Sequence, residues 1–144
     1  MAEKSVVVAI DESEHSLKAL QFYLDTIHRK EDKVILTYSA EIPYQPVQPL
    51  REDIVTDILK KVRDDAVRIE TKYKKFLGDK DVNFEVKSEF SHPGEFICKV
   101  SKEANAAMVV MGTRGMGTIR RTILGSVSDY VIHHAHCPVV VYKT

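Results

Sequence analysis

A glycine-rich segment that follows an apolar run combines the residue types and the spacing that could bind an anion. Residues 108–111 are apolar, Gly112, Gly115 and Gly117 come next, and Gly125-Ser126 precedes an amphipathic run. Glycine reaches left-handed backbone angles and lets a ligand come close to the main chain. Free N–H groups at a helix start, at the positive end of its dipole, favour phosphate. The segment therefore predicts a phosphate site, with an ordinary glycine-rich surface turn as the alternative.

The elements that position this segment are predicted from the periodicity of the apolar residues. Short runs rich in β-branched residues predict strands over 5–10, 33–39, 82–89, 108–111 and 138–142, with 82–89 at a sheet edge. Helical spacing predicts a helix capped by Ser13 or Ser16, and others over 51–77, 93–105 and 126–135. Gly78 is expected to follow the second helix as its C′ residue. Strands that alternate with helices predict an α/β fold, an open parallel sheet with helices on both faces.

Three motifs resemble those of the universal stress protein family. Gly112-x-x-Gly115, followed after nine residues by Gly125-Ser126, fits that family's G-x2-G-x9-G-S/T pattern. The opening VVAIDESEHS, residues 7–16, and the ending CPVVV, residues 137–141, are similar to the family's first and last strands. The resemblance covers essentially the whole chain. It implies a single domain over residues 1–144, with a Rossmann-like, adenine nucleotide alpha-hydrolase-like sheet of five parallel strands in the order 3-2-1-4-5.

With that strand order, the sheet reverses between its first and fourth strands, and ligands bind outside the carboxyl ends of strands at such a point. Asp11 and Gly112 follow these two strands, so a carboxylate and a glycine loop are expected at one crevice. We therefore predict a site for ATP, or for AMP or ADP, with Mg²⁺ joining through the phosphates. The expected binding residues are Ala9, Ile10, Asp11, Ser39, Ala40, Met111, Gly112, Arg114, Gly115, Gly125, Ser126, Val127 and Ser128.

Each part of the nucleotide has expected partners. Main-chain N–H groups near Gly115 and over 125–127 would hold the phosphates, with the hydroxyls of Ser126 and Ser128 as further donors. Arg114 either pairs with a phosphate or faces solvent. Asp11 would accept from a ribose hydroxyl or help to hold a cation, and Gly112 would let the ribose approach. The ends of the first two strands, 9–10 and 39–40, would wall the adenine.

Other chemistry is weakly supported. Metal ligands on a helix need i, i+3 or i, i+4 spacing to share a face, and in the cluster His133, His134, His136 and Cys137 the first two histidines point about 100° apart. Histidines at a helix end more often interact with the helix dipole, so no metal site is predicted. GxxxxGK(S/T) is absent, and the glycine segment holds no obvious general base, so any ATP hydrolysis should be slow. HxGH and SGGxDS loops are also absent, which counts against an adenylyl transferase. The first strand is not followed by a GxGxxG motif, which counts against an NAD site.

Composition sets the broad class. The chain of 144 residues is 44% hydrophobic and 29% charged, as in soluble globular proteins. Lys+Arg and Asp+Glu number 21 each, which argues against a surface for nucleic acid or for membranes. Two cysteines, no signal peptide and no run long enough to span a bilayer lead us to expect a cytoplasmic protein. The segment 41–49, with Pro43, Pro46 and Pro49, either covers a site or crosses the surface.

Three functional hypotheses remain open. The leading one is an ATP-binding universal stress protein that acts as a stress-response sensor or regulatory module and not as a turnover enzyme. The second is a slow ATPase that uses the same site, and the third is a protein-interaction module that needs no nucleotide. A homodimer is expected through the last strand, from Pro138 to Tyr142, because an apolar edge strand tends to pair.

Overall fold

The computed structural model describes residues 3–40, 51–113 and 125–143. In these residues strands and helices alternate, and the predicted bounds differ from the observed ones by about two residues at most. The Pro-rich segment 41–49 lies outside the described residues. The elements are β1 (Ser5–Ala9), α1 (Glu14–Thr26), β2 (Lys33–Ala40), α2 (Glu52–Gly78), β3 (Asn83–Phe90), α3 (Pro93–Glu103), β4 (Met108–Gly112), α4 (Ser126–His134) and β5 (Val139–Tyr142).

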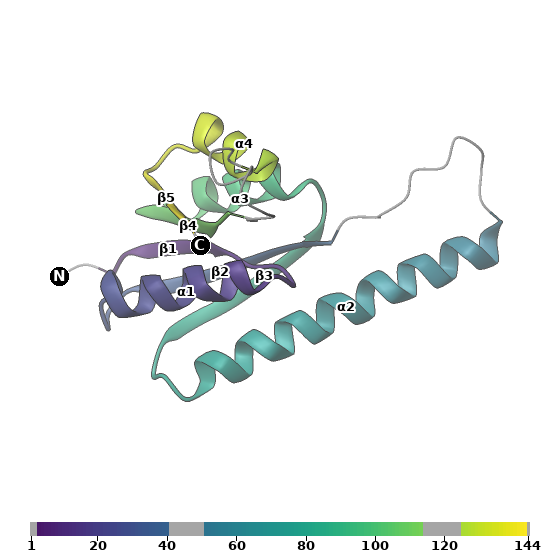
Figure 1. Ribbon diagram of the computed structural model, residues 1–144, viewed down its shortest axis with the longest axis horizontal. Helices are drawn as coiled ribbons and strands as arrows, with labels where there is room; N and C mark the ends of the chain where they lie inside the picture. Colours follow the sequence, from purple (N-terminus) through teal and green to yellow (C-terminus); the bar gives the residue numbers. More distant parts are fainter. Residues whose placement is uncertain (1–2, 41–50, 114–124, 144) are drawn as a thin grey trace.

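The strands form a parallel sheet in the order β3-β2-β1-β4-β5, as predicted. β1 is central, because Val7 pairs with Ile35 of β2 on one side and with Val109 of β4 on the other. Helices α1 and α2 cover one face of the sheet, and α3 and α4 cover the other (Figure 1). The predicted fold class, an open parallel α/β sheet with two helical layers, is therefore confirmed.

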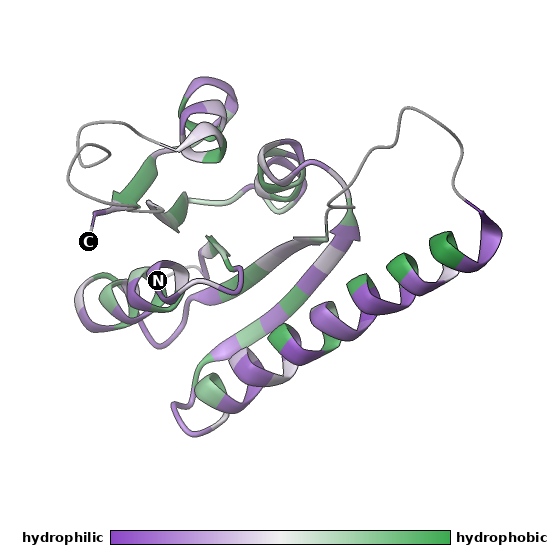
Figure 2. Ribbon diagram, turned by 45° about the vertical axis from the view of Figure 1, so that its right-hand side comes forward, coloured by the Kyte–Doolittle hydropathy of each residue, from purple (hydrophilic) through white to green (hydrophobic). Residues whose placement is uncertain are grey.

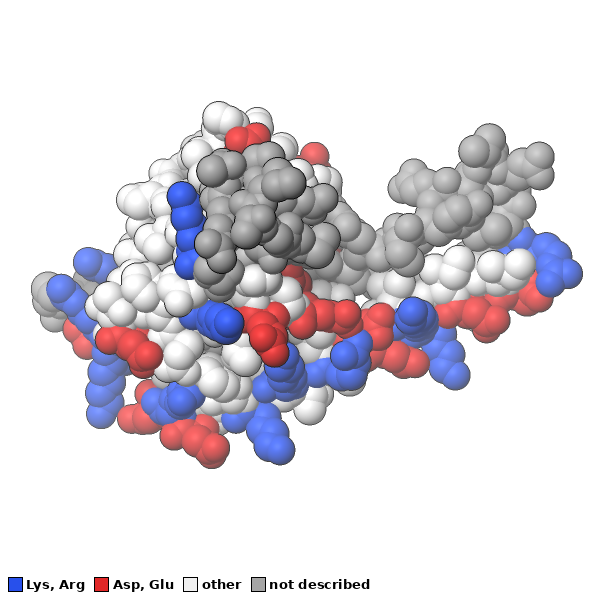
Figure 3. Space-filling model, in the orientation of Figure 1, with Lys and Arg blue, Asp and Glu red and all other residues white. Residues whose placement is uncertain are grey.

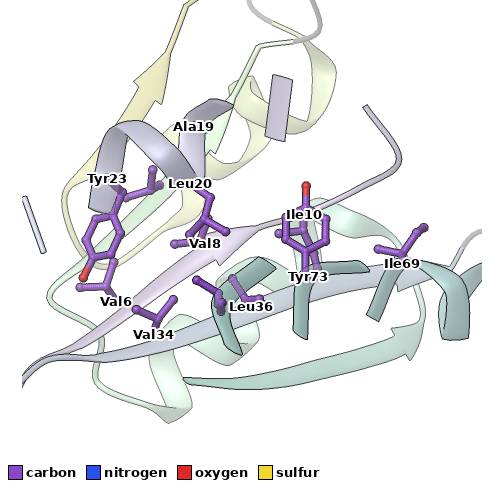
Figure 4. Packing of buried hydrophobic residues seen from close by; sticks show 12 residues of the cluster. Val6, Val8, Ile10, Ala19, Leu20, Tyr23, Val34, Leu36, Ile69 and Tyr73 are labelled. Atoms are coloured by element: carbon purple, nitrogen blue, oxygen red, sulfur yellow. The ribbon is translucent and has the colours of Figure 1, made fainter. Parts of the chain in front are cut away.

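Two apolar cores follow from the alternation of side chains along each buried strand. Val6 and Val8 of β1 point toward α1 and α2, where they pack in one cluster with Leu20 and Tyr73 (Figure 4). Val7 points to the opposite face and joins the cluster under α3 and α4. The central strands are almost wholly inaccessible to water, so the sheet forms a rigid floor for whatever lies at its ends.

Helix α1 begins where the sequence indicated. Of the two candidate caps, Ser13 is the N-cap, and its side-chain oxygen accepts a hydrogen bond from the backbone N–H of Ser16 at 3.4 Å. Ser16 lies inside the first turn and is buried. The cap fixes the point at which the chain leaves β1, turns at Asp11 and enters the helix.

Helix α2 is longer than the sheet it covers. Its carboxyl-terminal part packs on the sheet through Ile69, Tyr73 and Leu77, whereas its first turns extend past the sheet, with Ile54 and Val55 exposed (Figure 2). None of the helices in the described part of the chain, α2 included, has the length and apolarity needed to cross a bilayer.

The expectation for Gly78 was wrong. Gly78 is the last residue of α2, and the C-cap is Asp79 with φ −90° and ψ 0°. The left-handed residue of this turn is Asp81, with φ 50°. Aspartate tolerates positive φ better than most residues, so the turn reverses two residues after its C-cap without needing a glycine.

Candidate functional site

A pocket opens at the carboxyl ends of β1, β2 and β4, where the strand order reverses. It encloses about 800 Å³ that protein atoms do not occupy, with the solvent at its mouth included. The described residues that line it are Ala9, Ile10, Asp11, Ser13, Ser16, Thr37, Ser39, Pro93, Ile97, Met111, Gly112, Gly125, Ser126, Val127 and Ser128.

The ends of β1 and β4 are neighbours, which is the arrangement that the predicted site requires. Val8 of β1 pairs with Val110 of β4. The chain then continues from both strands into the same pocket, through Asp11 on one side and Gly112 on the other. A carboxylate and the start of the glycine segment, about a hundred residues apart in sequence, therefore meet at one crevice.

Most of the expected binding residues lie in this pocket. Those that line it are Ala9, Ile10, Asp11, Ser39, Met111, Gly112, Gly125, Ser126, Val127 and Ser128. Ala40 is buried at the end of β2 and is not one of the described lining residues. Arg114 and Gly115 lie outside the described residues. What these side chains bind stays a prediction, but the geometry brings them to one place.

The start of α4 forms one wall of the pocket. Gly125 is the N-cap, and the N–H of Asp129 donates to its carbonyl oxygen at 2.9 Å. The N–H groups of residues 126–128 precede that bond and belong to the first turn, where helix donors have no partner within the helix. A Cβ at Gly125 would meet no described atom within 4 Å, and φ there is −62°. Neither the described packing nor the backbone angle requires a glycine here. The missing side chain leaves space beside the N–H donors at the start of α4.

Gly112 has a different reason to be glycine. A Cβ on this residue would lie 2.6 Å from the carbonyl oxygen of His15, in the first turn of α1. The first turn of α1 can therefore pack on the end of β4 only because Gly112 lacks a side chain. We expected Gly112 to admit a ribose; in the structure its first neighbour is the protein's own backbone.

Asp11 helps to build the turn into α1. Its Oδ1 accepts hydrogen bonds from the backbone N–H of Ser13 at 2.8 Å and from the Ser13 hydroxyl at 2.5 Å. These bonds hold the carboxylate at the edge of the pocket. Any role for Asp11 toward a ribose or a cation has to be compatible with them.

A buried hydrogen bond links this turn to α2. The Ser16 hydroxyl lies 2.7 Å from the Tyr73 hydroxyl, and its oxygen also accepts from the backbone N–H of Asp11 at 3.1 Å. Tyr73 is fully buried. Burial raises the pKa of Tyr73 to about 12, against a smaller opposite effect of the bond to Ser16. Tyr73 therefore stays protonated and ties the middle of the α2 packing surface to the Asp11 turn.

Charge is sparse in the pocket itself. Asp11 is the only charged side chain among the described lining residues. On the face shown in Figure 3, the described basic and acidic side chains are interspersed, without the basic stripe that nucleic-acid-binding surfaces carry. The described part of the pocket thus offers phosphate a helix start and hydroxyls, and not lysine or arginine.

Comparison with known proteins identifies the family. The sequence profile of the universal stress protein family matches residues 3–143. The chain belongs to the universal stress protein family. The universal stress protein YxiE of Bacillus subtilis is 29% identical to it over 149 residues, which covers 96% of this chain and 97% of YxiE.

Solved structures of the family show the same fold as this universal stress protein. A family member from Arabidopsis thaliana with AMP bound superposes with a TM-score of 0.70 at 21% identity, covering 97% of this chain and 91% of that one. A universal stress protein in complex with cAMP gives a TM-score of 0.57 at 20% identity, with 96% of each chain covered. Two relatives of this fold are therefore known with adenine nucleotides bound.

Some residues that line the pocket were not predicted as site residues from the sequence. Ser13 and Ser16 were noted only as helix caps, and both also line the pocket. Pro93 and Ile97 reach it from the first turns of α3, and Thr37 reaches it from β2. A polar Thr37 that interrupts the apolar run of β2 was the one available signal, whereas the α3 contacts depend on tertiary packing.

The histidines at the end of α4 have separate partners. The Nε2 atom of His133 lies 3.4 Å from Oδ1 of Asp129. His134 donates from Nδ1 to the backbone carbonyl oxygen of Tyr130 at 2.8 Å, and its ring stacks on the Tyr130 ring. In the described residues, His, Cys, Asp and Glu form no group of three or more suited to a metal ion. These histidines are thus engaged with α4 itself.

Proposed function

We propose that this universal stress protein binds an adenine nucleotide in the pocket between the ends of β1 and β4 and works as a sensor or regulatory module. The observation that carries the proposal is the meeting of Asp11, Gly112 and the start of α4 in one pocket. The pocket offers apolar walls, from Ile97 and Met111 among others, for a base and amide donors for phosphate. The AMP and cAMP complexes of two relatives support adenine as the base.

ATP is our preferred ligand within this class. The G-x2-G-x9-G-S/T pattern is complete in the sequence, and the α4 start it leads to presents several N–H donors and two serine hydroxyls, enough for more than one phosphate. Mg²⁺ would join through the phosphates, which are its preferred partners in nucleotide sites. AMP and ADP would use fewer of the same donors.

Isothermal titration calorimetry with ATP, ADP, AMP and cAMP, each with and without Mg²⁺, tests the proposal. We expect saturable binding of at least one adenine nucleotide, with ATP bound more tightly than AMP and further tightened by Mg²⁺. GTP serves as the base control. The absence of binding by every adenine nucleotide at millimolar concentration would refute the proposal.

A slow ATPase is the second candidate, favoured by the carboxylate of Asp11 at the pocket edge. Asp11→Asn keeps an oxygen that can accept from Ser13 but removes the charge, and Asp25→Asn on the exposed side of α1 is the matched control. If the site hydrolyses ATP, phosphate release falls in the first variant and not in the second. Equal release from both variants would point to a contaminating enzyme.

A homodimer through β5 is proposed from its place in the sheet. β5 is an edge strand, and Val139 to Tyr142 are each partly accessible. Exposed backbone groups along an apolar edge favour pairing with another strand. Light scattering after size exclusion should give the dimer mass, and Val140→Lys should shift it toward the monomer. A monomeric unmodified protein at micromolar concentration would contradict this proposal.

A cytoplasmic location is proposed from the thiols. Cys98 and Cys137 are both free and partly buried, and burial raises the pKa of each thiol. Such thiols react slowly and suit a reducing compartment. Cell fractionation with a tagged chain should recover the protein with the cytosolic marker, and recovery with a secreted or membrane fraction would overturn the assignment.

A further inference from the structure

Thr37 lines the pocket and carries a buried hydroxyl that has no hydrogen-bond partner among the described residues. Its backbone is fixed by the centre of the sheet, since it pairs with Ala9 of β1 and its carbonyl oxygen accepts from the N–H of Ile10 at 2.9 Å. The residue is only 2% exposed, and it lines the pocket. Its Oγ1 is buried and has no hydrogen-bond partner among the described residues.

A buried hydroxyl without a hydrogen-bond partner is unusual in a folded protein. Buried polar groups nearly always have partners, because leaving one unsatisfied destabilises the fold. The three preceding residues of β2, Val34, Ile35 and Leu36, are all apolar and buried. A valine of the same shape would complete that pattern without an unsatisfied group. The packing of the sheet therefore gives no reason for a threonine at this position. The pocket that Thr37 lines gives one, because a bound ligand could supply the missing hydrogen-bond partner.

The position of Thr37 suits the base of a nucleotide and not its phosphates. Thr37 lies on β2, two strands from β4, which is about 10 Å across the sheet at the usual strand spacing. The glycine segment and the start of α4 follow β4, so the phosphate donors lie toward the other side of the pocket. On the face of the sheet that Thr37 shares, the lining residue Ile97 is apolar and can contact the face of a flat ring.

We propose that the Thr37 hydroxyl forms a hydrogen bond with the edge of the ligand's heteroaromatic base, and so determines specificity for a base with a polar edge at that point. A hydroxyl can donate to a ring nitrogen or accept from an exocyclic amine, both of which adenine carries. Ser39, two residues along β2, lines the same pocket and presents a second hydroxyl on the same side of the strand. This inference rests on the proposed function, from which it takes adenine as the base.

Calorimetry on Thr37→Val and Thr37→Ser tests the inference, with Thr56→Val on the exposed first turns of α2 as the matched control. AMP and ribose 5-phosphate, which lacks the base, are the two probes. We expect Thr37→Val to weaken AMP binding by about 5- to 150-fold and to leave ribose 5-phosphate unchanged. Thr37→Ser, which keeps the hydroxyl, should restore affinity for AMP to near that of the unmodified protein.

Thermal unfolding of the ligand-free protein supplies a second measurement, in which the melting temperature of Thr37→Val should not fall although its affinity for AMP does. Because the hydroxyl is unsatisfied there, Thr37→Val should unfold at the same temperature as the unmodified protein or higher. Loss of both melting temperature and affinity would show a merely structural role and overturn the inference. Equal AMP affinity in the unmodified protein and Thr37→Val would overturn it alone, whereas no binding by the unmodified protein would overturn the proposed function and this inference together.

Discussion

At the scale of single residues, Gly112 and Gly125 belong to one sequence pattern but differ in their surroundings. Gly112 is required by protein packing, since a Cβ there would lie 2.6 Å from the His15 carbonyl oxygen. Gly125 has open space around it among the described residues. The two positions can therefore be separated by experiment, although the sequence pattern treats them alike.

Gly112→Ala is expected to destabilise the fold. The added methyl group meets backbone, which cannot rotate away as a side chain can, so α1 or β4 has to shift. Overpacking of this kind costs about 1–3 kcal/mol. Urea unfolding should show the loss as a lower midpoint, and an unchanged midpoint would mean that α1 does not pack on Gly112 as described.

Gly125→Ala is expected to spare the fold and weaken ligand binding. The N-cap preference for glycine over alanine is offset by the entropy that alanine removes from the unfolded chain, so the free energy of unfolding should change by less than about 0.5 kcal/mol. The methyl group would occupy the space in front of the α4 donors, and nucleotide affinity should fall by about tenfold, or 1.4 kcal/mol. Unchanged affinity on titration would place the phosphates elsewhere.

At the scale of elements, a buried hydrogen bond between Tyr73 and Ser16 links α2 to the site. Tyr73→Phe removes the bond and leaves the Ser16 hydroxyl with one partner fewer, which should cost about 1 kcal/mol at pH 7. The ring still fills its place, so the variant should fold. Phe22→Leu, at a half-buried position of α1, is a control for a general loss of aromatic packing.

The same variant has a pH signature. The folded-state pKa of Tyr73 is raised above its unfolded value of 10.0 to about 12. A raised pKa means that its stabilisation is complete below pH 10 and is lost as the pH rises toward 12. The unmodified protein should therefore lose more stability than Tyr73→Phe over that window, by up to about 2–3 kcal/mol. Parallel pH profiles of the two proteins in chemical unfolding would contradict the burial of this hydroxyl.

At the scale of the whole molecule, binding and stability are linked. A ligand that binds only the folded chain adds about 2.7 kcal/mol at a concentration of 100 Kd. For a protein of this length that corresponds to a rise of roughly 5–10 °C in melting temperature. Differential scanning fluorimetry with ATP should show the rise. No shift at saturating ATP would be inconsistent with a site built from β1, β4 and α4 together.

The sequence was sufficient for the fold and for the location of the pocket. Continuous apolar runs such as 6–8 and 34–36 define central parallel strands, and the family resemblance supplied their order. It was not sufficient for features that depend on contacts between distant segments. The neighbour of Gly112, the bond from Ser16 to Tyr73 and the lack of a partner for the Thr37 hydroxyl among the described residues all depend on tertiary packing. The expectation for Gly78 was wrong because Asp81 could take the left-handed angle.

The first turns of α2, which extend past the sheet, should unfold locally more easily than the rest of the helix. The helix is held to the sheet at Ile69, Tyr73 and Leu77, whereas residues 51–57 are exposed on all sides among the described residues. Amide hydrogens should therefore exchange with deuterium in a gradient along a single helix, within seconds near Val55 and as slowly as global unfolding near Tyr73. Fraying from the amino-terminal end would then shorten α2 by several turns without disturbing the sheet.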